Sequence, residues 1–287
     1  MSAKIIDGKA IASQFREKMK EELKQLKSQE IIPGLAVIII GEDPASVSYV
    51  KAKIRACEEV GIYSRCIRLS GDTTEQELLQ HIDKLNQDVQ IHGILVQLPL
   101  PLHISEKAVI DAISPEKDVD GFHPMSVGNM LIGDECFLPC TPHGIVKMIQ
   151  HTGTELAGKN VVVVGRSNIV GKPVSMLLLQ ENATVTICHS KTQNLAEHTK
   201  KADILVVAVG KAGVIGPEHV SEGTIVIDVG VNRNAEGKLV GDVRFDELLS
   251  IASHITPVPG GVGPMTITML LYNTIESAKK HLPSVVV

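Results

Sequence analysis

Tyr49 and Lys53 lie four residues apart in the stretch SYVKAK, just after a turn that follows an apolar run. Residues four apart share one face of an α-helix, so a phenol and an amine would be neighbours there. A lysine shifts its pKa readily when it is desolvated, which would allow it to act as a base. The spacing also fits a solvated lysine beside a half-buried tyrosine, and the pair taken alone favours that interpretation.

The preceding residues indicate how this pair would be positioned. The apolar run Leu35 to Ile40 predicts a buried strand, and the turn Gly-Glu-Asp-Pro follows it. Pro44 fits the first turn of a helix, where its missing N–H costs nothing. The Tyr-Lys face would therefore lie near the carboxyl end of a strand, which is where open α/β sheets usually bind ligands.

Strand-like and helix-like runs alternate along the whole chain, which predicts α/β units with parallel sheets covered on both faces. A boundary falls in the stretch LPCTPHG, where Thr141 could cap a helix that starts at Pro142. We therefore expect a first domain over residues 1–140 and a Rossmann-like domain over 141–265. A final helix within 266–287 would return to the first domain.

Composition excludes several classes of function. A net charge of −5 without a basic block, no Trp, and only four Phe and three Tyr argue against nucleic-acid binding. Neither a secretory signal nor an apolar run of membrane-spanning length is present. The five cysteines form no CxxC pair, and Cys136 and Cys140 lack a second ligand pair for zinc. We expect reduced thiols, no metal, no membrane contact and a cytoplasmic location.

The stretch VVVVGRSNIVGKPVS predicts a nucleotide site. It indicates a buried strand, a turn flanked by Gly165 and Gly171, and a helix whose N–H groups and dipole suit a pyrophosphate. It is not GxGxxG, so the motif alone is weak. The next strand ends in His-Ser-Lys, without the acidic residue that would bind a ribose 2′-hydroxyl. Arg166 and Ser190 instead suit a 2′-phosphate, which favours NADP over NAD.

Seven motifs occur in order: SYVKAK, GILVQLPLP, PEKDVDGFHP, PCTP, VVGRSNIVGKP, CHSKT and PVPGGVGPMT. Together they resemble the bifunctional methylenetetrahydrofolate dehydrogenase/methenyltetrahydrofolate cyclohydrolase (FolD) family, from about Lys4 to the last helix. The resemblance implies a folate cleft between two domains and a homodimer. It also implies two reactions, namely hydride transfer from 5,10-methylenetetrahydrofolate to NADP and hydrolysis of the methenyl product to 10-formyltetrahydrofolate.

The family's catalytic residues map onto Tyr49, Lys53, Gln97 and Asp120. Lys53 is the candidate base that activates water, and Gln97 could hold Lys53 or a water. Tyr49 could relay a proton or stack on the ring, and Asp120 could accept hydrogen bonds from the pterin amino group. Asp118 is expected to be structural and to cap its own loop.

Two sets of binding residues complete these expectations. Prolines make the loop TPVPGGVGPMT rigid, and its glycines would allow a flat ligand to approach the backbone. The expected substrate-binding residues are Tyr49, Lys53, Gln97, Leu98, Asp120, Pro257, Pro259, Gly260 and Gly261. The expected NADP-binding residues are Gly165, Arg166, Ser167, Ser190 and Val231.

Two other readings compete with this one. A Tyr-xxx-Lys pair also marks short-chain dehydrogenases, but in those enzymes the nucleotide loop precedes the pair, and here it follows by more than a hundred residues. The second alternative is a non-catalytic NADP-binding or sensor protein of the same fold. Such a protein would be expected to have lost Lys53, Gln97 or Asp120, and all three are present.

Overall fold

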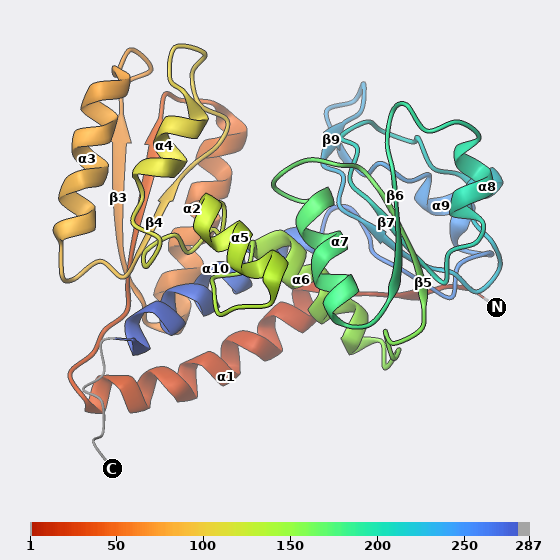
Figure 1. The fold of residues 1–287 in the computed structure, drawn as a ribbon, viewed down its shortest axis with the longest axis horizontal. Helices are drawn as coiled ribbons and strands as arrows, with labels where there is room; N and C mark the ends of the chain where they lie inside the picture. The colour runs from red at the N-terminus through yellow and green to blue at the C-terminus, as the bar shows by residue number, and fades with distance from the viewer. Residues whose placement is uncertain (1, 281–287) are drawn as a thin grey trace. The chain divides into compact units, whose positions relative to one another are not determined.

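A computed structural model describes residues 2–280 and divides into two compact units (Figure 1). The N-terminal unit consists of Gln14–Cys140 together with residues 267–280. The C-terminal unit consists of the residues up to Ser13 together with Thr141–Thr266. The expected α/β class with two domains is confirmed, and so is the return of the last helix to the first domain. Within residues 2–280, no helix combines the length and apolarity that crossing a bilayer requires.

The sheet of the N-terminal unit has β2 (Gly34–Ile40) between β3 (Tyr63–Leu69) and β4 (Gly93–Val96), and both pairings are parallel. All seven residues of β2 are buried, so the run of β-branched and aliphatic side chains forms a central strand with a covered face on each side. The strand expected over Leu35 to Ile40 is confirmed. Because the three strands are parallel, their carboxyl ends lie at the same end of this sheet.

Helices cover both faces of that sheet. Even-numbered residues of β2 pack against α3 (Glu75–Gln87) and α4 (Glu106–Ala112) in one core cluster. Successive strand residues point to opposite faces, so the odd-numbered residues of β2 face the other way. The helix α2 (Pro44–Val60) begins as expected at Pro44, with Asp43 as its N-cap. A further helix, α5 (Pro124–Ile132), lies in a stretch for which no element was predicted.

The C-terminal unit is built on a six-stranded sheet in the order β1-β11-β8-β7-β5-β6, with every pairing parallel. Its strands are β1 (Lys4–Ile5), β5 (Asn160–Val164), β6 (Thr184–Cys188), β7 (Ile204–Val207), β8 (Ile225–Asp228) and β11 (His254–Ile255). Its other elements are α6 (Cys140–His151), α7 (Gly171–Gln180), α8 (Leu195–Thr199), the short 3-10 turn Pro217–His219, α9 (Phe245–Leu248) and the antiparallel pair β9 (Asn232–Arg233) and β10 (Leu239–Val240). The expected Rossmann-like topology is confirmed.

Three boundaries differ from expectation. Residues 1–13 were expected in the first domain, but Lys4 and Ile5 pair with β11 and so belong to the C-terminal unit. Thr141 does not cap α6, which already begins at Cys140; its hydroxyl bonds that of Thr266 at 2.8 Å instead. The last helix begins earlier than expected, because half of the Gly-Pro-rich stretch is helical in α10 (Val262–Lys279). Residues 281–287 of the expected final helix lie outside the described residues.

The larger parts of two long helices complete the N-terminal unit. The helix α1 (Gly8–Ser28) contacts α10, since Arg16 donates from Nε to the Thr268 hydroxyl at 3.1 Å and Lys279 forms an ion pair with Glu22. Ser277 of α10 donates to the carbonyl of His92 at 2.6 Å, beside the start of β4. The final helix therefore supplies polar partners to the backbone of the sheet that it covers.

Candidate active site

Lys53 is buried on α2, with only 7% of its surface exposed. Its Nζ donates a hydrogen bond to Oε1 of Gln97 at 3.0 Å. Gln97 follows directly after β4, and its backbone N–H donates to the Ile38 carbonyl of β2 at 2.8 Å. The expected contact between the glutamine amide and the lysine is therefore present, and the solvated interpretation of Lys53 is excluded.

The amide of Gln97 is fixed from its other side as well. Its Nε2 donates to the carbonyl of Leu98 at 2.6 Å, which leaves Oε1 directed at the lysine. Leu98 is partly exposed at the same strand end. Gln97 thus orients the Nζ of Lys53 by accepting a hydrogen bond from it, and both the neutral amine and the ammonium can donate that bond.

Lys53 and Asp120 perturb one another in opposite directions. Burial lowers the pKa of the Lys53 ammonium, and the Asp120 carboxylate opposes that shift. Burial raises the pKa of Asp120, and Lys53 opposes it. Perturbed titratable pairs are frequent at catalytic sites. Tyr49 keeps 37% of its surface exposed, and burial of the remainder raises its pKa, so the phenol carries its proton at neutral pH.

Asp118 has the structural role that its position suggested. One of its oxygens accepts from the backbone N–H of Phe122 at 3.2 Å, and the other accepts from the His123 N–H and the Ser126 hydroxyl, both at 2.8 Å. Burial raises the pKa of Asp118 to about 6. These bonds close the loop that carries Asp120, so Asp118 holds the loop and Asp120 is not needed for that purpose.

Two residues that sequence reasoning missed hold the same loop. Asn273 of α10 donates from Nδ2 to the carbonyls of Val119 at 2.8 Å and Leu138 at 2.9 Å. The thiol of Cys140 also bonds the Val119 carbonyl, at 3.3 Å. Asn273 is the single Asn of α10, and no local pattern marks its role because its partners lie more than 130 residues away in the sequence.

The second group of expected site residues lies at the carboxyl edge of the C-terminal sheet. Gly165 follows β5, and its N–H donates to the carbonyl of Cys188, the last residue of the neighbouring β6, at 2.9 Å. A Cβ at Gly165 would lie 2.3 Å from the Ala208 carbonyl oxygen, so only glycine fits there. Arg166 and Ser190 are both exposed in the loops that follow these two adjacent strands.

Ser167 and Val231 lie at this edge too. The Ser167 hydroxyl accepts from the N–H groups of Val170 and Gly171, both at 3.2 Å, and its carbonyl accepts from Lys172. The N–H groups of these three residues are therefore already paired within the turn, and the prediction of a pyrophosphate site there concerns the remaining N–H groups. Val231 exposes 51% of its surface just beyond the end of β8 and offers an apolar contact.

The loop over residues 256–261 belongs to the C-terminal unit. It contains Pro257, Pro259, Gly260 and Gly261, and the hydroxyl of Thr256 anchors it by accepting from the N–H of Asp228 at 2.7 Å. The expected site residues therefore form two sets, one at the strand ends of each unit. Tyr49, Lys53, Gln97, Leu98 and Asp120 form the first set, and the nucleotide and loop residues form the second.

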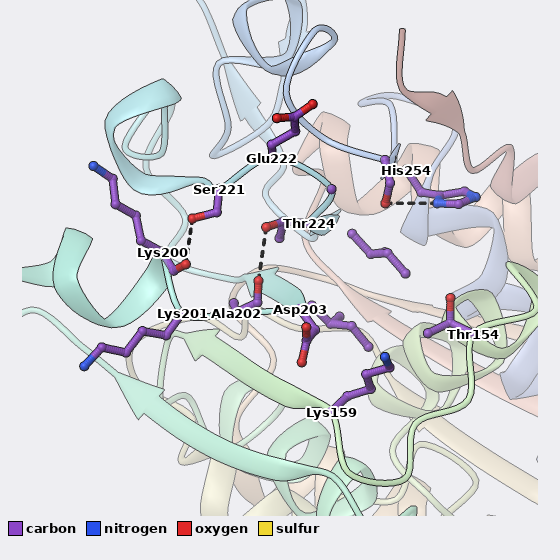
Figure 2. A pocket seen from close by; sticks show the side chains of 14 residues that line it. Thr154, Lys159, Lys200, Lys201, Ala202, Asp203, Ser221, Glu222, Thr224 and His254 are labelled. Carbon is purple, nitrogen blue, oxygen red and sulfur yellow. Dashed lines mark hydrogen bonds between the residues drawn. The ribbon is translucent and has the colours of Figure 1, made fainter. Parts of the chain in front are cut away.

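A depression of about 410 Å³ in the C-terminal unit is lined by none of these expected site residues (Figure 2). Its lining includes Lys159, Asp203 and Thr224, which immediately precede β5, β7 and β8. It therefore lies at the amino ends of the strands, whereas α/β sheets bind nucleotides at the carboxyl ends. In Figure 2, Lys200 and Lys201 extend away from the labelled residues around Asp203, so the lysines do not converge on one point.

Comparison with known proteins identifies the family. Residues 6–120 match the model of the tetrahydrofolate dehydrogenase/cyclohydrolase catalytic domain, and residues 139–282 match that of the NAD(P)-binding domain. The chain is 64% identical over 281 residues to bifunctional protein FolD of Brevibacillus brevis, covering 98% of this chain and 99% of that protein. The chain belongs to the tetrahydrofolate dehydrogenase/cyclohydrolase family.

Solved structures of the family agree with the fold. The bifunctional FolD enzyme of Campylobacter jejuni matches with a TM-score of 0.96 at 50% identity, covering 98% of this chain and 100% of the other. The FolD of Trypanosoma brucei, whose structure holds NADP and an inhibitor, matches with a TM-score of 0.93 at 39% identity, covering 98% of both chains. The family's NAD(P)-binding domain is thus the C-terminal unit, and the catalytic domain is the N-terminal one.

Proposed function

We propose that this chain oxidises 5,10-methylenetetrahydrofolate with NADP as the hydride acceptor and hydrolyses the 5,10-methenyl product to 10-formyltetrahydrofolate, with Lys53 as the base of the second step. The chain is a methylenetetrahydrofolate dehydrogenase and methenyltetrahydrofolate cyclohydrolase by family. The observation that carries the assignment to residues is the buried Lys53, held by Gln97 beside Asp120. A non-catalytic relative would have no need to retain this arrangement.

The oxidative step needs orientation more than proton transfer. Bound NADP supplies the hydride acceptor, and the chain places the folate C–H bond against it. Loss of hydride leaves a delocalised cation on the folate, which a nearby ammonium would destabilise. Burial of Lys53 favours the neutral amine and so lowers that penalty. The Asp120 carboxylate can accept hydrogen bonds from the pterin N–H groups and fix the ring.

The hydrolytic step uses the same amine as a base. Neutral Lys53 takes a proton from the water that attacks the methenyl carbon, and the resulting ammonium can return a proton to the departing ring nitrogen. Gln97 keeps the Nζ in one place through its Oε1. Tyr49 stays protonated, so in this scheme its phenol donates a hydrogen bond or stacks on the ring.

This function is tested by mixing the purified protein with methylenetetrahydrofolate and NADP and following NADPH and the methenyl absorbance. We expect NADPH to form while 10-formyltetrahydrofolate is the end product. Starting from methenyltetrahydrofolate without NADP isolates the second step. Absence of both signals in the folded protein would overturn the proposal.

The choice of NADP over NAD rests on Arg166 and Ser190. Both are exposed on adjacent loops at the edge where the adenosine ribose would lie, and no acidic side chain ends β6. A guanidinium and a hydroxyl fit a 2′-phosphate, whereas an NAD site would carry a carboxylate for the ribose hydroxyls. The donor set therefore suits NADP.

Replacing Arg166 with Ala is expected to weaken NADP binding far more than NAD binding. Loss of a charge-assisted contact costs about 1.5–3 kcal/mol, or roughly ten- to hundred-fold in affinity. Titration of both cofactors by calorimetry measures the difference, and Arg233→Ala, which removes another exposed arginine of the same unit, serves as control. Equal losses for NADP and NAD would place Arg166 at the pyrophosphate instead.

We also propose that the enzyme is a cytoplasmic homodimer. The five free thiols are in keeping with a reducing compartment. The strand β3 lies at an edge of its sheet with Tyr63 47% exposed, and edge strands are usually covered by another element or another chain. Analytical ultracentrifugation is expected to give a mass near twice 30.9 kDa, and a monomer at micromolar concentration would contradict the dimer.

A further inference from the structure

Two buried carboxylates lie side by side in the C-terminal unit, and neither belongs to the expected site. Asp228 is the last residue of β8 and exposes 3% of its surface. Asp242 follows the short strand β10 and exposes none of its surface. Burying charged groups is costly unless they are hydrogen-bonded. The hydrogen-bond partners of these two side chains therefore indicate which part of the structure the buried carboxylates hold in place.

Asp228 fixes the segment that carries Asp242. Its Oδ1 accepts from the N–H groups of Gly230 at 2.9 Å and Asp242 at 3.0 Å, and its Oδ2 accepts from the Val243 N–H at 3.0 Å. A Cβ at Gly241 would lie 1.8 Å from Oδ2, so the backbone reaches the carboxylate only because that residue is glycine. Asp228 therefore sets the position of Asp242.

Asp242 in turn holds the loop after β7 and the start of β9. Its Oδ2 accepts from the N–H groups of Val209 at 2.7 Å and Gly210 at 2.9 Å. Its Oδ1 accepts from the N–H of Lys211 at 2.9 Å and the side-chain Nδ2 of Asn232 at 2.8 Å. The first three donors belong to the loop after β7, and the fourth, Asn232, is the first residue of β9, which follows the loop after β8.

The strand order shows which part of a dinucleotide these loops would meet. The chain runs from β5 to β6 on one side and then crosses to β7 on the other side of β5, so the order reverses between β5 and β7. A dinucleotide binds across the carboxyl ends at such a reversal, with its adenosine half toward the second strand of the first set. Arg166 and Ser190 lie on that side, and the loops held by Asp242 lie on the other.

We infer that Asp242 is a positioning residue for the nicotinamide half of the cofactor, and that Asp228 supports it. Asp242 touches no ligand in this scheme; it fixes the backbone of the 209–211 loop and, through Asn232, the segment that presents Val231. The inference rests on the proposed binding of NADP at this edge. Under this inference, the adenosine half and the nicotinamide half of the cofactor bind to different loops, and Asp242 holds only the loops on the nicotinamide side.

Only a carboxylate satisfies all four donors. An asparagine at position 242 has one acceptor oxygen, and its amide nitrogen would face N–H groups that also donate. Asp242→Asn thus conserves the shape of the side chain but removes the hydrogen bonds to one of its two oxygens. The 166–167 and 190 loops make no bond to Asp242, so the adenosine side is left intact.

The test compares ligands that contain and lack nicotinamide. Calorimetry with NADP and with 2′,5′-ADP measures whole-cofactor and adenosine-side binding, and stopped-flow absorbance measures hydride transfer. For Asp242→Asn we expect hydride transfer to fall by about ten-fold or more, NADP affinity to fall, and 2′,5′-ADP affinity to stay within about two-fold. Hydrolysis of methenyltetrahydrofolate, which uses Lys53 of the other unit, is expected to be unchanged.

Asp203→Asn is the matched control. Its carboxylate accepts from the N–H of Asn160 at 2.8 Å, and it sits at the amino ends of the strands in the depression of Figure 2. This variant is expected to leave hydride transfer and binding of both ligands unchanged. Asn232→Ala, which removes one donor to Asp242 and keeps the carboxylate, is the second variant if Asp242→Asn does not fold, with a smaller effect in the same direction.

The outcomes separate the inference from the function on which it rests. Parallel loss of NADP and 2′,5′-ADP binding would show that Asp242 merely maintains the unit as a whole and would overturn the inference. Unchanged hydride transfer in both Asp242→Asn and Asn232→Ala would overturn it as well. Failure of the unsubstituted enzyme to bind NADP or to transfer hydride would instead refute the proposed function.

Discussion

Replacing Lys53 with Met is expected to abolish most methenyltetrahydrofolate hydrolysis while hydride transfer to NADP continues. Met conserves the length of the side chain and fills the buried position, but it removes the amine that Gln97 holds. A positioned general base typically contributes about 10²–10⁴-fold to the rate, so hydrolysis should fall within that range. The methenyl product should then accumulate, which its absorbance reports directly.

The neighbouring Lys51 provides a matched control on the same helix, because it is exposed. Lys51→Met should leave both half-reactions at the unsubstituted rate. Each half-reaction is started from its own substrate in the folded variant. A parallel fall of both rates in Lys53→Met would show that the lysine positions the folate for both steps, and the assignment as base would then be wrong.

Asp120→Asn is expected to reduce both half-reactions, in contrast to the lysine variant. Both steps require the folate in one pose, and a misplacement of about 1 Å can cost about 10²-fold in rate. The Asp120 carboxylate opposes the lowering of the Lys53 pKa by burial, and the substitution removes that negative charge. We therefore expect weaker folate binding in equilibrium titrations together with the loss of both rates.

The exposed Asp134, on the same connection between β4 and α6, is the corresponding control. Asp134→Asn removes an equal charge without touching the loop that Asp118 closes, so folate binding and both rates should stay the same. Unchanged folate affinity and turnover in Asp120→Asn would exclude this carboxylate from the site.

Much of the fold could be predicted because its main elements are long and strongly patterned. The seven buried residues of β2 and the amphipathic pattern of α1 can be recognised in the sequence. The two-residue strands β1 and β11 are not, since their pairing depends on residues about 250 positions apart. The helix α5 was missed because it is short and exposes Leu131 and Ile132, so no helical apolar stripe marks it.

The candidate site likewise has residues that could be predicted from the sequence and supporting residues that could not. The proximity of Tyr49 and Lys53 follows from helical spacing. The contact of Lys53 with Gln97 follows because both lie near carboxyl ends of neighbouring strands. The supports of that site could not be predicted. Asn273 reaches the Asp120 loop from a helix at the other end of the chain, and such contacts carry no local pattern.

The wide separation of those partners has a consequence for how the protein is made. Asn273 and Ser277 satisfy backbone carbonyls of the N-terminal unit, yet they are synthesised more than 130 residues after those carbonyls. The strand β1 likewise has to wait for its partner β11, which is synthesised about 250 residues later. The N-terminal unit therefore cannot close on the ribosome before α10 has emerged, and the C-terminal unit cannot close before β11 has emerged. The final folding steps of the two units are therefore expected to come late and close together in time.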